Sequence, residues 1–275
     1  MDHRMSARRS RQLALFLTLF VLLFALNTSV RAGILRIETQ TGVTVAGDLL
    51  KVRVRATNKG TGRAHNVQVH LILLSEQYHG PVKARLDPGQ TDTVLFERTL
   101  SRIKKGRYPL TVLVDFHDAN QYPFSAVSCT TFHFKEDANP DLLCLGSDMA
   151  LETGGELGFT VKNLGFEPRK VRATLVLPKE LSTPRPHMDR DIDPRSEKPV
   201  VFEITNFSAL SGASYPVFCY LEYDFEDTHY TALARALVKI VKGENWFRRT
   251  KLFWLVAAVI LGVILVALQF KRKGS

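Results

Sequence analysis

The chain has 275 residues, of which 45% are hydrophobic, and its 37 lysines and arginines against 27 aspartates and glutamates give a formal net charge of +10. Five arginines against one aspartate in residues 1–32, and six basic residues without an acid in residues 248–275, account for the whole excess. The region between them is close to neutral, which excludes the basic face that a nucleic-acid-binding domain needs. No nucleic-acid partner is therefore expected.

Residues 1–32 have the pattern of a secretory signal peptide. Basic residues precede a short apolar run, residues 13–26, and Val30-Arg31-Ala32 follows as an A-x-A-like cleavage site. Such a run is short for a membrane span. Retention of the run as a first helix is the alternative, and it would export the same central region.

The central region reads as short β-strands separated by turns. Residues 49–56 and 67–73 alternate apolar and polar side chains with period two, which indicates half-buried antiparallel strands. Asn58-Lys59-Gly60 is a turn in which positive φ is expected, and Pro88-Gly89 favours a type II turn. Several short strands with regular turns are typical of a β-sandwich.

This pattern occurs twice, at an offset of 105 to 109 residues. A period of this length fits one sandwich domain, so the sequence predicts two tandem sandwiches, residues 33–137 and 138–243. The matched pairs are Asn58 and Gly60 with Asn163 and Gly165, Asp87-Pro88 with Asp193-Pro194, Tyr108 with Tyr215, and Asp115 with Asp224. In the second copy Arg195 stands where the turn glycine, Gly89, is found in the first.

The motifs of the first copy resemble those of the cell-adhesion-related domain found in bacteria (CARDB) and its immunoglobulin-like relatives. They are Asn58-Lys59-Gly60, residues 64–71, residues 86–91 with Pro88 and Gly89, Gly106-Arg107-Tyr108 and Val114-Asp115. The resemblance implies extracytoplasmic, immunoglobulin-like modules used in adhesion, as spacers or in larger assemblies. The motifs are structural turns, so they concern the fold more than the function.

Tyr108 and Tyr215 each precede a strand and are similar to the tyrosine corner, in which a tyrosine hydroxyl bonds to the backbone a few residues upstream. Cys219 lies at a position expected to face the core. A disulfide between Cys144 and Cys219 is compatible with export, and buried free thiols are the alternative.

Sites for chemistry are sparse. Asp115 and Asp118, and again Asp224 and Asp227, follow strands and are weak candidates for a cation, with solvated turn residues as the competing interpretation. Ser101-Arg102-Ile103-Lys104 has the spacing of some acyl enzymes, but its partner motifs are absent from the sequence. We therefore expect no catalytic residue, metal or cofactor.

The C-terminal segment is predicted to anchor the chain. Residues 244–251 form a juxtamembrane segment, residues 252–270 are long and apolar enough for a transmembrane helix, and residues 271–275 form a basic cytoplasmic tail. Trp254 suits the membrane interface, and the three basic residues of the tail close the span. These tail residues are Lys271, Arg272 and Lys273.

The sequence thus predicts a single-pass protein of the cytoplasmic membrane, all-β outside it, whose domains face the periplasm or the cell exterior. A non-catalytic binding or scaffold role is expected, with the lipid bilayer and another envelope protein or surface glycan as partners. The alternatives are an accessory subunit of a membrane transport or envelope-biosynthesis complex, a carbohydrate or surface adhesion module, and a hydrolase with an unrecognised site. Tyr78, Tyr122 and Tyr230 are the aromatic residues considered for glycan binding.

Overall fold

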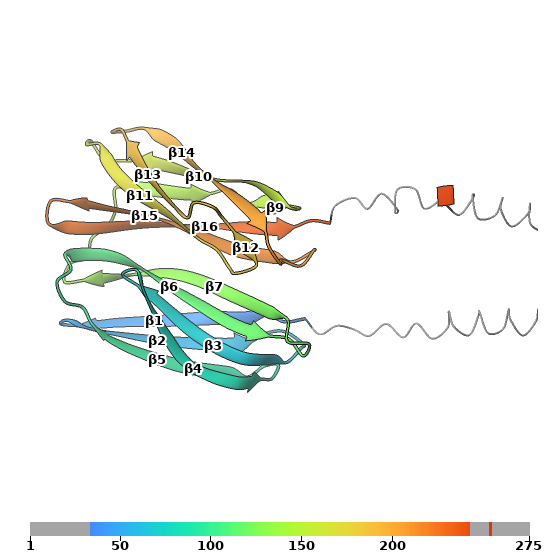
Figure 1. Ribbon diagram of the computed structural model, residues 1–275. Coiled ribbons are helices and arrows are strands. Elements are labelled where there is room, and N and C mark those ends of the chain that lie inside the picture. The colour runs from blue at the N-terminus through green and yellow to red at the C-terminus, as the bar shows by residue number, and fades with distance from the viewer. Residues whose placement is uncertain (1–33, 243–252, 255–275) are drawn as a thin grey trace, which may run out of the picture. The chain divides into compact units, whose positions relative to one another are not determined.

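The computed structural model describes residues 34–242 and 253–254. Between Ile37 and Ile240 the regular structure is entirely β, in sixteen strands (Figure 1). The prediction of an all-β fold is therefore confirmed for residues 34–242. Both sandwiches described below belong to one compact unit that begins at Leu35.

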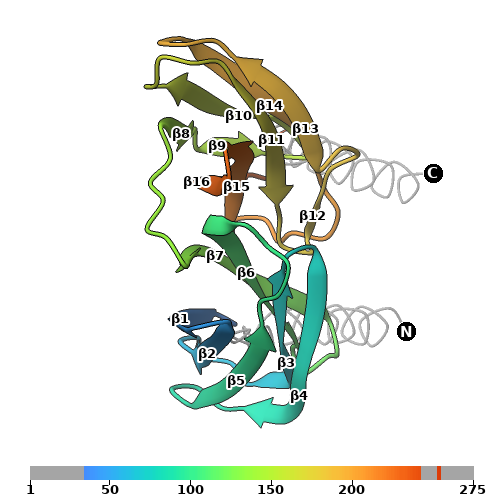
Figure 2. The ribbon, with the colours of Figure 1, turned by 90° about the vertical axis from the view of Figure 1, so that its left-hand side faces the viewer.

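Sandwich 1 contains β1 to β7. A sheet in the order β1-β2-β5 packs against the strands β4-β3-β6-β7, all antiparallel to their neighbours. Figure 2 shows the two layers from the side, with β1 and β2 opposite β3 and β4. The strands are β1 Ile37–Ala46, β2 Leu49–Asn58, β3 Ala64–Leu73, β4 Glu76–Leu86, β5 Thr91–Thr99, β6 Lys105–His117 and β7 Pro123–Phe134.

Sandwich 2 contains β8 to β16. A sheet in the order β12-β14-β10-β8 packs against the strands β13-β11-β15-β16, and β9 pairs with the end of β16. The strands are β8 Leu142–Gly146, β9 Met149–Leu151, β10 Gly154–Asn163, β11 Arg169–Val176, β12 Leu181–Ser182, β13 His187–Ile192, β14 Glu197–Asn206, β15 Ser214–Phe225 and β16 Thr228–Ile240.

Each sandwich has its own apolar core, filled by the inward residues of its alternating strands. In β2, Leu50, Val52 and Val54 are fully buried, while Lys51 and Arg53 between them are exposed. In β15, Val217, Cys219 and Leu221 are fully buried at the positions expected to face inward. Alternation at period two therefore places one face of each strand in a core and the other in water.

The two asparagines of the repeat make the same hydrogen bonds in both sandwiches. The Asn58 amide donates to the carbonyls of Gly62 and Leu86 at 2.8 and 2.9 Å, and its Oδ1 accepts the Gly60 N–H at 3.0 Å. Asn163 donates to the carbonyls of Glu167 and Ile192 and accepts the Gly165 N–H at 2.9 Å. Buried side chains at equivalent places thus tie one strand to the next turn.

This observation corrects the sequence-based account of the first turn. Positive φ was expected within residues 58–60, but Gly60 does not adopt it, because the Asn58 side chain closes the turn instead. At the second turn Gly89 has φ +79°, and the Gln90 N–H donates to the Asp87 carbonyl at 3.0 Å. In sandwich 2 the equivalent Arg195 has φ +53°, so a non-glycine residue occupies the left-handed region there.

Candidate functional site: the joint between the two sandwiches

The two sandwiches are joined where the start of β6 lies beside the start of β16. Thr228 pairs with Lys105 and His229 with Gly106 in a short parallel ladder, which links strands of both sandwiches into one nine-stranded sheet. Gly106 has φ +137°, and a Cβ added to it would lie 2.0 Å from the His229 carbonyl oxygen. Only glycine permits so close an approach of the two backbones.

A buried carboxylate, Glu180, lies at the same joint in the segment between β11 and β12 and is 1% exposed. Its Oε1 accepts the Ser125 N–H at 2.6 Å, and its Oε2 accepts the Ser125 hydroxyl at 2.7 Å. Ser125 Oγ in turn accepts the Lys179 N–H at 2.8 Å. The carboxylate of one sandwich is therefore satisfied by β7 of the other, as a buried charge requires.

A small apolar cluster completes the joint. Leu113 and Val127 of sandwich 1 pack with Phe218 of sandwich 2, and all three are buried. Cys129, Val176 and Leu233 pack around them. Apolar burial favours association, while the charged hydrogen bonds at Glu180 fix the register, so the joint has the character of a specific interface.

His229 connects the joint to the outer surface of sandwich 2. Its ring stacks on Tyr108 of sandwich 1, with centroids 4.3 Å apart and an interplanar angle of 12°. Its Nδ1 lies 2.7 Å from Asp224 Oδ1, and its Nε2 lies 3.4 Å from Glu222 Oε1. Burial alone would lower the pKa of His229, but hydrogen bonds and charge attraction from Glu222 and Asp224 outweigh it, so the pKa is raised.

The raised pKa of His229 predicts a pH-dependent stability. The stabilisation is fully present below the pKa of an unfolded histidine, about 6.5, and is lost as the pH rises through the higher folded value. We expect the difference in unfolding free energy between wild type and His229→Gln to shrink from pH 6 upward, as measured by urea denaturation. Equal differences at acid and alkaline pH would contradict this assignment.

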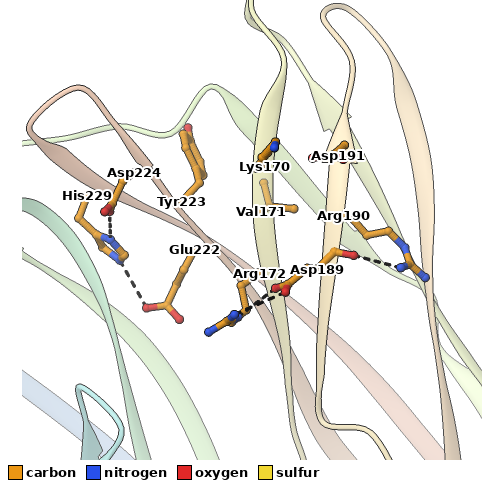
Figure 3. Close-up of a pocket in the computed structure, with 10 residues that line it drawn as sticks. All are labelled: Lys170, Val171, Arg172, Asp189, Arg190, Asp191, Glu222, Tyr223, Asp224 and His229. Carbon is orange, nitrogen blue, oxygen red and sulfur yellow. Dashed lines mark hydrogen bonds and ion pairs between the residues drawn. The ribbon is translucent and has the colours of Figure 1, made fainter.

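Beside His229, a shallow groove of about 640 Å³ runs over the outer face of β11, β13 and β15 (Figure 3). Two pairs of charged side chains lie in it: His229 contacts Glu222 and Asp224, and Arg172 donates to Asp189 through Nε at 2.9 Å and Nη2 at 3.4 Å. The lining residues are Lys170, Val171, Arg172, Asp189, Arg190, Asp191, Glu222, Tyr223, Asp224 and His229. An open groove of alternating charge suits contact with a polar surface better than enclosure of a small molecule.

A second polar chain reaches the joint from β3. His70, which is 4% exposed, lies between His79, at 2.7 Å, and Asp115, at 2.9 Å. Burial lowers the pKa of His70 despite the nearby Asp115 carboxylate. The same Asp115 Oδ2 accepts from Lys179 Nζ at 2.5 Å.

The acidic residues considered for a cation have other roles. Asp115 contacts His70 and Lys179. Asp118 Oδ1 accepts the N–H groups of Asn120 and Tyr122, both at 2.8 Å. Asp224 pairs with His229 and with Lys104 at 3.0 Å, and Asp227 is exposed at the β15–β16 turn. Within residues 34–242 and 253–254 no group of three or more His, Cys, Asp or Glu side chains could hold a metal ion.

The corner tyrosines bond to the backbone in different senses. The Tyr108 hydroxyl donates to the Lys104 carbonyl at 2.7 Å, and burial raises its pKa to about 12, so it stays protonated. The Tyr215 hydroxyl accepts the Leu210 N–H at 3.1 Å. Both tyrosines therefore pin the segment that precedes their own strand.

The tyrosines considered for glycan binding do not form one platform. Tyr78 on β4 lies under the Arg98 guanidinium, 3.9 Å from ring centroid to Cζ. Tyr122, in the β6–β7 loop, donates to the Ser208 carbonyl, and Tyr230 on β16 stacks on a neighbouring tyrosine of β15. Each ring is engaged by its own neighbour, on a different element.

The cysteines are free thiols in the structure, so the disulfide between Cys144 and Cys219 is not formed there. The two residues lie on opposite sheets of sandwich 2, on β8 and β15, and both are buried. A hydrogen bond to Cys144 and burial together raise the pKa of Cys219, which keeps that thiol protonated. The pair packs as part of the apolar core.

The predicted membrane segments lie almost wholly outside the described residues. The signal peptide and the tail residues Lys271, Arg272 and Lys273 are not among them, and of the span only Phe253 and Trp254 are, in a helix with Trp254 48% exposed. In the part of the chain that the structure describes, no helix is long and apolar enough to cross a membrane.

The joint between the sandwiches is not predicted by the sequence patterns described above. Glu180 and Ser125 are not predicted as site residues, because each lies 55 residues from its partner. His229 is considered only with Asp224, Glu226 and Asp227 for a cation, because its backbone partner in the joint, Gly106, is far away in the sequence. The sequence predicts Gly106 only as part of a turn motif. The available signal is a charged pair, Lys179-Glu180, between the apolar stretch that ends at Pro178 and Leu181.

Comparison with known proteins gives no family. No protein-family model matches the chain. No curated protein matches it either. Solved structures similar to it include alpha-2-macroglobulin from Escherichia coli, at 9% identity and TM-score 0.29 over 75% of this chain and 17% of that one. Salmonella alpha-2-macroglobulin follows at 11% identity, TM-score 0.31, and 76% and 16% coverage.

A third similar structure is red sea bream transglutaminase, at 15% identity and TM-score 0.27, with 76% of this chain and 31% of that one covered. The chain thus spans less than a third of the length of each of these three proteins. TM-scores near 0.3 carry no argument about function.

Proposed function

We propose that this chain is a non-catalytic binding or scaffold protein, anchored in the cytoplasmic membrane by residues 252–270, with two tandem immunoglobulin-like domains facing the periplasm or the cell exterior. The observation that carries the proposal is the joint. Buried hydrogen bonds at Glu180, a glycine-dependent backbone contact and an apolar cluster hold the two sandwiches together. Such a pair presents its loops and edges as one rigid surface.

The sequence supports the location. An export signal and a terminal apolar run flank a nearly neutral β region, and the motifs of the first sandwich resemble CARDB domains. Two ion pairs in the groove, Arg172 with Asp189 and His229 with Asp224, support a binding role. Paired charges on an open surface favour contact with a polar partner, such as an envelope protein.

Cysteine labelling with a membrane-impermeant maleimide tests the location. Glu203→Cys, at an exposed position of β14, should react in cells whose cytoplasmic membrane is intact and whose outer layers have been opened. Ser275→Cys, in the tail, should react only after lysis. The reverse pattern, or labelling of both sites only after lysis, would overturn the proposed topology.

The accessory-subunit alternative gives the helix itself a binding role. Under that alternative, exchanging residues 252–270 for an unrelated apolar span would abolish function and remove any co-purifying membrane protein. Under our proposal the exchanged chain keeps its function, because the sandwiches carry the contact surface and the span serves only as an anchor.

A further inference from the structure

The loop 207–213, between β14 and β15, presents large apolar side chains to solvent. Phe207 is 79% exposed and Leu210 is 48% exposed. The loop backbone is nevertheless fixed: Asn206 Oδ1 accepts the Ala209 N–H at 2.7 Å, and the N–H groups of Phe207 and Ser208 donate to the Glu180 carbonyl. A fixed loop that holds apolar side chains outward is a surface built for contact.

This loop lies beside the end of β16, where the chain leaves sandwich 2. The Gly212 N–H donates to the Ile240 carbonyl at 2.8 Å, and the Ile240 N–H donates to the Ala213 carbonyl at 2.9 Å. Val241, the next residue, is 37% exposed. Only the ten residues 242–251 separate it from the apolar run that starts at Leu252, a reach of at most about 35 Å.

Sandwich 1 begins at the same end. Ile37, the first residue of β1, pairs with Asn58 at the end of β2, and His65 at the start of β3 pairs with His117 at the end of β6. Because β6 and β16 run parallel, the end of β6 points the same way as the end of β16. The chain therefore enters and leaves the pair of sandwiches at one end.

We propose that this end faces the bilayer and that Phe207 and Leu210 lie in its interface, at the boundary between headgroups and acyl chains. The inference rests on the proposed membrane anchor. Lipid is the favoured occupant because the tether holds the loop within reach of the membrane and because aromatic and aliphatic side chains gain by burial at that depth. When the loop 207–213 lies in the membrane interface, the groove over β11, β13 and β15 and the loops at the opposite end of the sandwiches point away from the membrane.

The test uses the full chain reconstituted in phosphatidylcholine and phosphatidylglycerol vesicles, with Cys129→Ser to remove the least buried native thiol. A fluorophore on Leu210→Cys is quenched by lipids that carry bromine or nitroxide at known depths. The matched control carries the fluorophore on Phe166→Cys, because Phe166 is 81% exposed. The start of β10 pairs with Thr205, just before the loop 207–213, whereas Phe166 follows the end of β10. Phe166 therefore lies at the other end of sandwich 2.

We expect strong quenching at residue 210 by shallow lipid quenchers and none at residue 166, with quenching at 210 reduced at least twofold by adding Phe207→Asp. If the chain floats with the vesicles but residues 210 and 166 respond alike, the loop inference is wrong and the anchor stands. If quenching at residue 210 by the lipids falls as the protein concentration rises, the loop contacts a second copy of the chain, and the inference is overturned. If the chain does not float with the vesicles, anchor and inference fail together.

Discussion

Gly106→Ala is expected to break the joint and let the two sandwiches unfold separately. The added methyl group would lie 2.0 Å from the His229 carbonyl oxygen, and φ at this position, +137°, is one that alanine rarely adopts. Strain and overpacking of this kind each cost about 1–3 kcal/mol, so the backbones separate rather than tolerate the contact. In urea, the single transition expected of the wild type should become two.

Gly212→Ala is the matched control for this change. Gly212 also has positive φ, +86°, but a Cβ there meets nothing within 4 Å. The Gly212→Ala variant therefore has the backbone strain alone, about 1 kcal/mol, and should still unfold in urea in one transition. Identical unfolding of the two variants would show that the contact between Gly106 and His229 does not hold the sandwiches together.

Glu180→Ala is expected to destabilise the protein by about 2–4 kcal/mol. Hydrogen bonds to a charged group contribute more to stability than neutral ones, and their loss leaves a buried donor without an acceptor. The alanine leaves the Ser125 N–H without the acceptor that it has at 2.6 Å. It also removes the acceptor of the Ser125 hydroxyl. Chemical denaturation of the full sandwich pair measures the change.

Two further variants make this prediction specific. Glu180→Gln keeps an oxygen for the Ser125 N–H but places an amide against the hydroxyl, so it should lose about half as much stability. Glu203→Ala removes an exposed carboxylate and should change stability by less than about 0.5 kcal/mol. A loss at Glu180 no larger than that at Glu203 would mean that the buried ring contributes little.

The strands were predictable because their information is local. Alternation in residues 49–56 reports directly which side chains face the core, and the repeat doubles the evidence. Turn geometry was only partly predictable: Gly89 has the positive φ that its sequence suggests, whereas at residues 58–60 a side-chain hydrogen bond replaced the expected backbone conformation. Glycine in a turn motif indicates a turn but not which atom closes it.

The joint could not be predicted in this way. Periodicity distinguishes the two faces of one sheet, but it does not say which outward residue of one sandwich meets the other. Ser125 is an ordinary strand serine until Glu180, 55 residues away, lies against it. Likewise, the sequence alone marks Gly106 as a turn glycine, and only the fold brings the His229 backbone beside it. Contacts between residues so far apart in the sequence form only when both domains are folded.

The most direct test of the rigid joint is a distance distribution between spin labels on Thr93→Cys and Glu203→Cys in the full chain in nanodiscs, with Cys129→Ser. Both positions are exposed, one on β5 of sandwich 1 and one on β14 of sandwich 2. A rigid pair predicts one narrow distribution that broadens when Gly106→Ala is added and stays narrow with Gly212→Ala. A broad distribution in the otherwise unchanged chain would contradict the rigid scaffold.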